Sequence, residues 1–388
     1  MIINEVFAKS INDSRGEKTI EVEIKTDVGN FKASSPTGKS TGKYESKSYK
    51  KSLEKDIETL EKFKNYFSEE VIENFEDLRR IEDIVEGHIG ANTLFALESA
   101  TLKAVAKEQK KEVWQLINPA AKNFPRLVGN CIGGGKHSSP IGDRKKKPDF
   151  QEFLLIPKEN SPTKAWEKNI ETKKEVESIL KKSDEYFKSK KNDENAWMVS
   201  LNEKEVLDVL AKVKIDLGVD VAASSFYKRK KYNYENPQLK RTFDEQIIYL
   251  SNLIKNYPLI YIEDPFGEEE FEEFAQLLEK FPDRMIVGDD LTVTNVKRLK
   301  KAIKMKSVNA LIVKPNQNGS LLEVKKVCEL AKENNIKIIF SHRSGETKEN
   351  ILADLAFGFS ADFLKCGIDG IEREVKINRL IEIEKSFK

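Results

Sequence analysis

The chain has 388 residues, which is enough for two or three domains with a large hydrophobic core. Its 67 basic and 65 acidic residues leave a formal net charge of only +2, although charged residues make up 34% of the chain. This balance gives no electrostatic reason to expect nucleic acid or an anionic membrane as a partner. The apolar runs are far shorter than the roughly 20 residues that cross a bilayer.

The cysteines argue against both a disulfide framework and a structural zinc site. Cys131, Cys328 and Cys366 are odd in number and far apart, and none belongs to a Cys-x-x-Cys pair. The first residues lead directly into folded-looking sequence without the pattern of a secretory signal. We therefore expect a soluble protein of a reducing compartment, the cytoplasm.

The first third of the chain predicts an α+β domain over residues 1–120. Alternating apolar residues bounded by turn signals predict three short strands, over residues 2–7, 19–25 and 29–33. Helical spacing follows over residues 51–117 and includes a helix of small residues at 91–106. Runs of strands followed by runs of helices are typical of an α+β unit. The Pro- and Asn-containing segment 118–125 marks the expected boundary.

The segment Gly38-Lys39-Ser40-Thr41 resembles the end of a nucleotide-binding P-loop. A P-loop needs a second glycine five positions earlier and a helix that begins at the lysine. Position 33 is Ala33, and Gly42 follows at once with no helical period. The pattern therefore disfavours a nucleotide site and leaves an ordinary surface loop as the simple alternative.

The last two thirds of the chain predict a (β/α)8-type barrel over residues 121–388. Six short apolar runs each end in an ionisable residue, namely Asp220, Glu263, Asp289, Lys314, His342 and Lys365. Amphipathic helices are expected between them, over residues 268–281, 295–305, 321–334 and 348–359. A doubly wound sheet would show the same alternation. A barrel is favoured because its strand ends converge on one pocket, where six ionisable groups have a purpose.

Each strand-end residue has an ordinary explanation when it is taken alone. A carboxylate there often caps the next helix, a lysine reaches out to water, and His342 could be a core histidine. Together, three carboxylates on successive strand ends form an all-oxygen set that suits Mg²⁺. A lysine close to such a metal has a lowered pKa and can act as a base. The chemistry indicated is proton removal next to a carboxylate, as in the enolase superfamily.

The chain resembles the enolase family from end to end. The motifs that carry the likeness lie at residues 12–22, 36–45, 90–92, 133–137, 151–154, 262–266, 287–295, 313–319 and 341–347. The resemblance implies Mg²⁺-dependent dehydration of 2-phospho-D-glycerate to phosphoenolpyruvate, in glycolysis and gluconeogenesis. It also implies a homodimer or larger homo-oligomer.

The resemblance assigns metal ligands. Asp220, Glu263 and Asp289 match the carboxylates that hold the first Mg²⁺ of the family. Ser40 matches the serine that binds a second Mg²⁺, which arrives with substrate when the segment around residues 36–45 closes as a lid. On this interpretation the Gly-Lys-Ser-Thr segment serves a phosphorylated ligand and a metal rather than a nucleotide.

The resemblance also assigns roles around the substrate. Lys314 matches the base that removes the C2 proton, and Glu194 matches the acid that protonates the departing 3-hydroxyl. Lys365 matches the lysine that, with two Mg²⁺, stabilises the aci-carboxylate intermediate. The other matches are Glu152 and Gln151 as partners of the acid, Arg343 and Ser344 as the phosphate clamp, and His342 and His137 near the substrate.

Several positions depart from the family pattern. Asn195 and Ala196, followed by Trp197, replace two glycines after the acid, and a β-carbon there restricts the backbone. Other departures are Lys39 on the lid, Lys50 in place of an arginine, a longer basic segment at 140–148, and a shortened motif at 370–373. Two alternatives stay open: a paralogue that acts on a different phosphorylated or carboxylated acid, and a non-catalytic binding protein.

Overall fold

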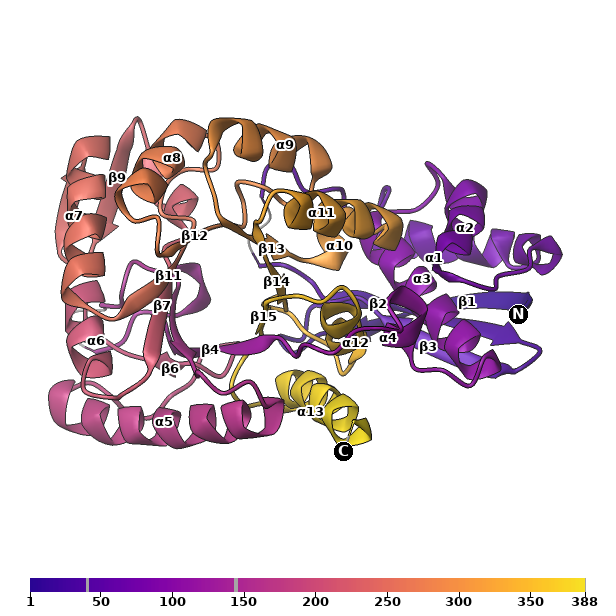
Figure 1. Cartoon of the computed structure of the whole chain (residues 1–388), viewed down its shortest axis with the longest axis horizontal. Helices are drawn as coiled ribbons and strands as arrows, with labels where there is room; N and C mark the ends of the chain where they lie inside the picture. The colour runs from indigo at the N-terminus through magenta and orange to yellow at the C-terminus, as the bar shows by residue number, and fades with distance from the viewer. Residues whose placement is uncertain (40–41, 143–145, 388) are drawn as a thin grey trace.

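The computed structural model describes residues 1–39, 42–142 and 146–387 (Figure 1). The expected second-metal ligand Ser40 lies outside the described residues. A three-stranded sheet with helices occupies one end of the molecule, and a closed barrel ringed by helices occupies the other. Among the described residues, no helix has the length and apolar character needed to cross a membrane.

The N-terminal sheet is an antiparallel meander. Its strands are β1 (Ile3–Asn12), β2 (Lys18–Thr26) and β3 (Gly29–Ser34), paired in the order β1-β2-β3. The three predicted strands are confirmed, although β1 extends further because Asn12 still pairs with Lys18 across the hairpin. Alternate residues of β2 (Ile20, Val22 and Ile24) are fully buried, so one face of the sheet forms a core.

Four helices follow the sheet. They are α1 (Leu53–Phe63), α2 (Leu78–Val85), α3 (Ala91–Glu108) and α4 (Val113–Ile117), with two short 3₁₀ turns over Tyr66–Glu69 and Phe75–Asp77. Of these, α1 and α3 pack directly against the sheet. The small residues of α3 let it pack closely against β2 and β3, and most of its side chains are buried. The helical spacing expected over 51–117 is therefore realised as separate helices around one central, buried helix.

The barrel is a closed ring of eight strands. They are β4 (Arg126–Gly133), β5 (Glu152–Ile156), β7 (Asp216–Asp220), β11 (Leu259–Glu263), β12 (Met285–Gly288), β13 (Ala310–Val313), β14 (Lys337–Ser341) and β15 (Phe363–Lys365). Pairing of β15 with β4 closes the ring, and β6 (Trp197–Met198) adds to β4 from outside. The predicted (β/α)8-type barrel is confirmed.

One strand of the ring runs in the opposite direction. β5 pairs antiparallel with both β4 and β7, while the other neighbours in the ring pair in parallel. Its first residue, Glu152, therefore lies at the rim where the other strands end, opposite Asp220 on β7 and Gly133 on β4. The sequence pattern did not predict this reversal, which adds a carboxylate to the rim.

The outer layer consists mainly of helices. They are α5 (Pro162–Ser183), α6 (Glu203–Leu210), α7 (Phe243–Asn256), α8 (Phe271–Lys280), α9 (Val296–Met305), α10 (Pro315–Asn318), α11 (Leu321–Glu333), α12 (Ile351–Gly358) and α13 (Ile371–Ser386). A small sheet of β8 (Tyr227–Lys228), β9 (Lys231–Glu235) and β10 (Gln238–Arg241) precedes α7. Predicted helices are present at the expected places, with ends shifted by a few residues.

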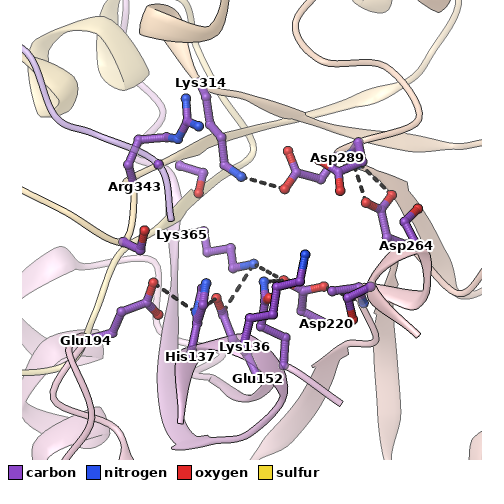
Figure 2. A pocket seen from close by; sticks show the side chains of 18 of the residues that line it. Lys136, His137, Glu152, Glu194, Asp220, Asp264, Asp289, Lys314, Arg343 and Lys365 are labelled. Atoms are coloured by element: carbon purple, nitrogen blue, oxygen red, sulfur yellow. Dashed lines mark hydrogen bonds and ion pairs between the residues drawn. The ribbon is translucent and has the colours of Figure 1, made fainter. Parts of the chain in front are cut away.

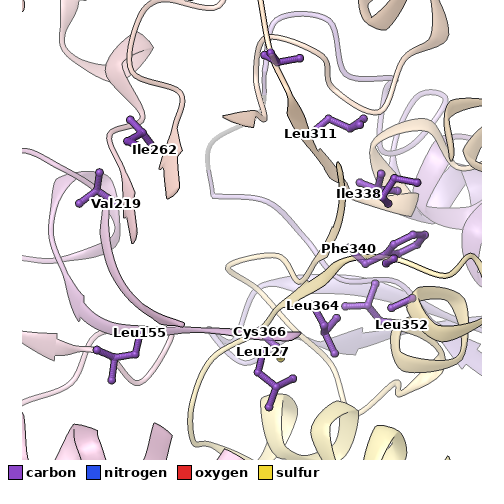
Figure 3. Packing of buried hydrophobic residues seen from close by; sticks show 14 of the residues in the cluster. Leu127, Leu155, Val219, Ile262, Leu311, Ile338, Phe340, Leu352, Leu364 and Cys366 are labelled. Carbon is purple, nitrogen blue, oxygen red and sulfur yellow. The ribbon is translucent and has the colours of Figure 1, made fainter. Parts of the chain in front are cut away.

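The barrel strands are buried on both faces. One set of side chains, including Leu127, Val219, Ile262, Leu311 and Phe340, points outward against the helices (Figure 3). The alternate set fills the interior, and comprises Val128, Leu154, Ile156, Tyr261, Met285, Val287, Ala310, Ile312, Ile339 and Phe363. The interior is thus a packed core that supports the polar rim above it.

Buried polar contacts join the N-terminal helices to the barrel. Glu98 on α3 is fully buried, and its Oε2 accepts a hydrogen bond of 2.6 Å from the Leu321 backbone N–H at the start of α11. Ser320, which caps α11, donates to the Glu82 carboxylate on α2. Burial, reinforced by the neighbouring Glu82 carboxylate, raises the pKa of Glu98 well above its ordinary value.

Replacing Glu98 with glutamine tests this contact. A carboxyl whose pKa is raised on folding contributes stability that is present at low pH and lost as the pH rises through the folded value. The Glu98→Gln amide still accepts from Leu321 and carries no charge. We expect Glu98→Gln to be more stable than wild type at pH 8 by on the order of 1 kcal/mol, with the difference vanishing at about pH 4, near the ordinary pKa of glutamate, measured by urea unfolding.

Candidate active site

A polar pocket of about 190 Å³ opens at the rim where the parallel strands of the barrel end (Figure 2). Charged or polar side chains line this pocket, and they come from the ends of nearly all ring strands or from the residues that directly follow those ends. The lining includes Lys136, His137, Gln151, Glu152, Glu194, Asp220, Asp264, Asp289, Asp290, Lys314, His342, Arg343, Ser344 and Lys365. The structure therefore brings together all expected site residues of the described chain, with Glu263 buried beside this lining.

Lys365 lies among three carboxylates at one side of the pocket. Its Nζ is 2.7 Å from Glu263 Oε2 and 3.2 Å from both Asp220 Oδ2 and Glu152 Oε2. Burial opposes its charge, but the carboxylates of Glu152, Glu263 and Asp220 outweigh burial and hold the pKa of Lys365 well above its ordinary value. Burial, opposed by Lys365, raises the pKa of Glu152 to about 8.

Lys314 and Asp289 form a second ion pair across the pocket. The Lys314 Nζ donates to Asp289 Oδ2 at 2.5 Å, and both residues follow directly after strands β13 and β12. Burial opposes the charge of Lys314, and the Asp289 carboxylate overcomes it, so the pKa of Lys314 is raised. Asp264 organises the turn after β12, because its oxygens accept from the backbone N–H groups of Asp289 and Asp290 at 2.9 and 2.8 Å.

The carboxylates of the pocket fit a hard divalent cation. Glu263 is fully buried, and its Oε1 has no hydrogen-bond partner among the described residues. Burial and the nearby Asp220 carboxylate outweigh the attraction of Lys365 and raise the pKa of Glu263 well above its ordinary value, so Lys365 alone does not offset the cost of ionising these carboxylates together. An unpartnered carboxylate oxygen in such surroundings is the donor that Mg²⁺ prefers.

The expected triad is not one compact cluster in this structure. Asp220 and Glu263 are held by Lys365, whereas Asp289 is held by Lys314. Oxygens of Asp264, Asp289 and Asp290 lie within 4.8 Å of one another and form a second arrangement able to hold a metal. The three expected metal ligands are therefore split into two ion-paired groups, one around Lys365 and one around Lys314.

Glu194 and His137 form the opposite wall. His137 Nδ1 lies 3.2 Å from Glu194 Oε1, and the Asn130 side chain donates to Glu194 Oε2 at 2.9 Å. Glu194 is buried, which favours its neutral form, but His137 outweighs burial and holds the pKa of Glu194 well below its ordinary value. For His137, burial opposes protonation, and Glu194 overcomes it and raises the pKa.

The loop around Glu194 keeps a glycine-like backbone despite its substitutions. Asn195 adopts a φ of 62°, in the left-handed region that asparagine tolerates better than most residues. The Asn192 side chain accepts from the backbone N–H groups of Glu194 and Ala196, at 3.0 and 2.9 Å. The buried Lys173 donates to the Asn195 carbonyl oxygen at 2.5 Å. With Asn195 and Ala196 in this loop, Glu194 still lines the pocket.

Arg343 and Ser344, expected as a phosphate clamp, follow β14 and contact the segment expected as a lid. Arg343 Nη2 donates to both oxygens of the Glu45 carboxylate, at 3.2 and 3.0 Å. Ser344 Oγ accepts from the Lys39 backbone N–H at 2.7 Å, and the Lys39 ammonium is 2.9 Å from Asp193 Oδ2. The Lys39 departure thus links this segment to the residue beside Glu194.

His342 and Gln151 complete the pocket. Burial, reinforced by the cationic Arg373 and Lys365, overcomes the attraction of Glu194 and holds the pKa of His342 well below its ordinary value, so the ring is neutral. Its Nδ1 has no hydrogen-bond partner among the described residues. The Gln151 side-chain amide lies 3.4 Å from Asp220 Oδ2.

Several pocket residues were missed by the sequence reasoning. Asp264 and Asp290 directly follow two expected metal ligands, and their motif positions could have indicated them. Lys136 precedes His137, and Asn130 lies within β4, where no pattern distinguished it. Lys50, which departs from the family pattern, is not among the residues that line the pocket; its backbone N–H donates to Asp56.

The basic segment at 140–148 braces the turn that carries His137. Lys147 donates to the Ser138 carbonyl oxygen at 3.0 Å and to the Gly135 carbonyl oxygen. Residues 143–145 lie outside the described part of the chain. The shortened motif at 370–373 keeps Arg373, which is fully buried and donates to the Ser344 carbonyl oxygen at 2.8 Å. In both departures, a basic side chain donates to backbone carbonyl oxygens next to residues that line the pocket.

Comparisons with known proteins cover the whole chain. The family model described as "Enolase, N-terminal domain" matches residues 3–117, and "Enolase, C-terminal TIM barrel domain" matches residues 122–388. A curated protein named "Enolase" from Pyrobaculum aerophilum is 36% identical over 99% of this chain and 96% of its own length. Proteins of the same name from Methanosphaera stadtmanae and Archaeoglobus fulgidus are 36% and 34% identical over 100% and 99% of this chain, and over 97% and 98% of their own lengths.

The ion pair of His137 with Glu194 makes a testable prediction. With Glu194→Gln, burial is no longer offset by the nearest carboxylate, so we expect the pKa of His137 to fall. The chain has 3 histidines, so an NMR pH titration of the imidazole signals can resolve each of them. Asp193→Asn is the control, because Asp193 is a smaller cause of the raised pKa and its substitution should lower it less. An unchanged His137 titration in Glu194→Gln would contradict the pairing.

Proposed function

Because the chain belongs to the enolase family, and is therefore a hydro-lyase of the phosphopyruvate hydratase type, we propose that it converts 2-phospho-D-glycerate reversibly to phosphoenolpyruvate with Mg²⁺. The reaction belongs to glycolysis and gluconeogenesis. The observation that supports the proposal most strongly is the placement of Lys314 and Glu194 on opposite sides of one carboxylate-rich pocket (Figure 2).

Asp220, Glu263 and Asp289 would hold the first of two Mg²⁺ ions. The family implies a divalent metal, and the unpartnered Glu263 Oε1 and the all-oxygen donor set suit Mg²⁺. The bound cations would supply fixed positive charge where negative charge develops on the substrate carboxylate. Ser40, proposed as a ligand of the second ion, lies outside the described residues.

Lys314 would remove the proton from C2 of the substrate. A base must have a free amine, whereas Lys314 donates to Asp289 in this structure. Lys314 becomes a base only when Asp289 is engaged elsewhere, since the Asp289 contact is what raises its pKa. With Asp289 engaged, burial and the nearby cations Arg343 and Lys365 would favour the neutral amine.

Glu194 would give a proton to the 3-hydroxyl as the C3–O bond breaks, so that water leaves. Proton removal at C2 and bond breaking at C3 then balance, with the electron pair forming the C2–C3 double bond. His137 Nδ1 lies 3.2 Å from Glu194 Oε1 and 3.6 Å from Glu152 Oε1, so His137 would be the group that passes a proton to Glu194. Burial raises the pKa of Glu152 to about 8, so this carboxyl would hold a proton near neutral pH.

The remaining residues would bind the substrate. Arg343 and Ser344 would hold the phosphate, for which a guanidinium fork is well shaped. Lys365 would neutralise the carboxylate, and His342, His137 and Gln151 would complete the walls. The substrate is a small phosphorylated acid.

We extend the proposal to the organisation of the protein. A capping domain over residues 1–120 and a barrel domain over 121–388 would together form the protomer. The protein would be cytoplasmic and would form a homodimer or larger homo-oligomer.

Lys314→Ala tests the proposed base. We expect wild type with Mg²⁺ to form phosphoenolpyruvate at above about 1 per second, measured by ultraviolet absorbance, and a chelator to abolish this rate. Lys314→Ala should lower kcat by about 10²–10⁴-fold, the usual contribution of general base catalysis. Lys55→Ala, at an exposed lysine on α1, is the matched control. A folded wild type without turnover of 2-phospho-D-glycerate would contradict the proposed substrate.

Glu194→Gln separates the two halves of the reaction. Without an acid for the 3-hydroxyl, dehydration should fall by about 10²–10⁴-fold. Lys314 remains, so the C2 hydrogen of 2-phospho-D-glycerate should still exchange with solvent deuterium, followed by NMR. Lys314→Ala should lose exchange and dehydration together. If Glu194→Gln loses exchange as fully as Lys314→Ala, the division of roles is wrong.

A further inference from the structure

Tyr261 lies directly below the carboxylates of the pocket. It precedes Glu263 by two residues on β11, so both side chains lie on the interior face of the barrel. The Tyr261 ring is fully buried in the barrel interior, in a cluster of apolar side chains that includes Met285, Val287 and Ile312. Its hydroxyl donates a hydrogen bond of 2.5 Å to Glu263 Oε2. The Tyr261 hydroxyl, a polar group within this apolar layer, therefore has the Glu263 carboxylate as its hydrogen-bond partner.

The two carboxylate oxygens of Glu263 differ in their hydrogen bonds. Oε2 accepts from the Tyr261 hydroxyl and also from the Lys365 ammonium, at 2.7 Å. Oε1 is buried and has no hydrogen-bond partner among the described residues. With Oε2 doubly engaged, the orientation of the carboxylate is fixed and Oε1 is the oxygen left for a cation.

The neighbouring strand makes room for the Tyr261 ring. Gly218 on β7 is the register partner of Tyr261, just as Asp220 is the partner of Glu263. A β-carbon at Gly218 would lie 3.0 Å from the Tyr261 Cβ and 3.1 Å from its Cδ1, which is closer than side chains normally pack. A side chain at position 218 would therefore require the Tyr261 ring to shift by a few tenths of an ångström.

We propose that Tyr261 is a positioning residue of the cation site, whose hydroxyl holds Glu263 so that Oε1 faces the metal. The proposal rests on the proposed function, since it assigns Glu263 as a Mg²⁺ ligand. Tyr261 acts through Glu263 and contacts neither substrate nor metal. Hydrogen-bond partners of metal ligands commonly change metal affinity by about 10–100-fold, because they fix ligand orientation.

The test is Mg²⁺ binding to full-length Tyr261→Phe without substrate, measured by isothermal titration calorimetry. We expect the dissociation constant for Mg²⁺ to rise by about 10–100-fold, with a matching rise in the Mg²⁺ concentration that half-activates the enzyme. Because the defect is one of metal affinity, raising Mg²⁺ should recover more of the rate than it does in Lys314→Ala. Gly218→Ala, which pushes against the intact Tyr261, should also weaken Mg²⁺ binding, and it carries the test if Tyr261→Phe does not fold.

Tyr234→Phe is the matched control. Tyr234 is also buried, but its hydroxyl donates to Gln246 at 2.8 Å, so its loss should leave Mg²⁺ affinity unchanged. Equal or tighter Mg²⁺ binding by folded Tyr261→Phe would overturn the proposal while leaving the proposed function intact. A wild type that neither binds Mg²⁺ nor turns over 2-phospho-D-glycerate would overturn the proposed function instead.

Discussion

The contact on which the site depends is the Lys365 ammonium among Glu152, Asp220 and Glu263. Three carboxylates buried this closely would repel one another strongly without a cation between them. The reversed direction of β5 creates this situation, because it brings Glu152 to the rim opposite Asp220. Lys365 at the end of β15 offsets part of this repulsion, and a further cation would offset the rest.

Charge pairing also sets the charge of the proposed acid and the proposed base. Lys314 and Glu194 each have a buried partner of opposite charge, Asp289 and His137, which keeps both in their charged forms. To remove a proton, Lys314 would need to be a neutral amine. To donate a proton, Glu194 would need to be a protonated carboxyl. On the proposed mechanism, ligand binding would have to disturb both pairs before chemistry, which would couple occupancy of the site to its reactivity.

The sequence predicted the barrel and its site because the information is local there. Each of the strand-end residues from Asp220 to Lys365 follows an apolar run, and parallel strands must place such residues at one rim. The direction of β5 was not predictable from its five residues, since a short buried strand has the same composition either way. Asn130 and Tyr261 were missed for a related reason: each lies inside a strand, and only the closed ring shows what its side chain faces.

The departures from the family pattern change residues that support the proposed site residues, while the proposed site residues themselves are retained. Asn195 retains the left-handed backbone that glycine would provide, and Lys173 fixes its carbonyl oxygen from the buried side. Arg373 supports Ser344 from behind in the same way. A binding protein without catalytic function would have no use for compensations that hold Glu194 and Ser344 in place. The pattern of substitution therefore favours an enzyme, and the Lys39–Asp193 ion pair joins the segment around residue 39 to the loop that carries Glu194.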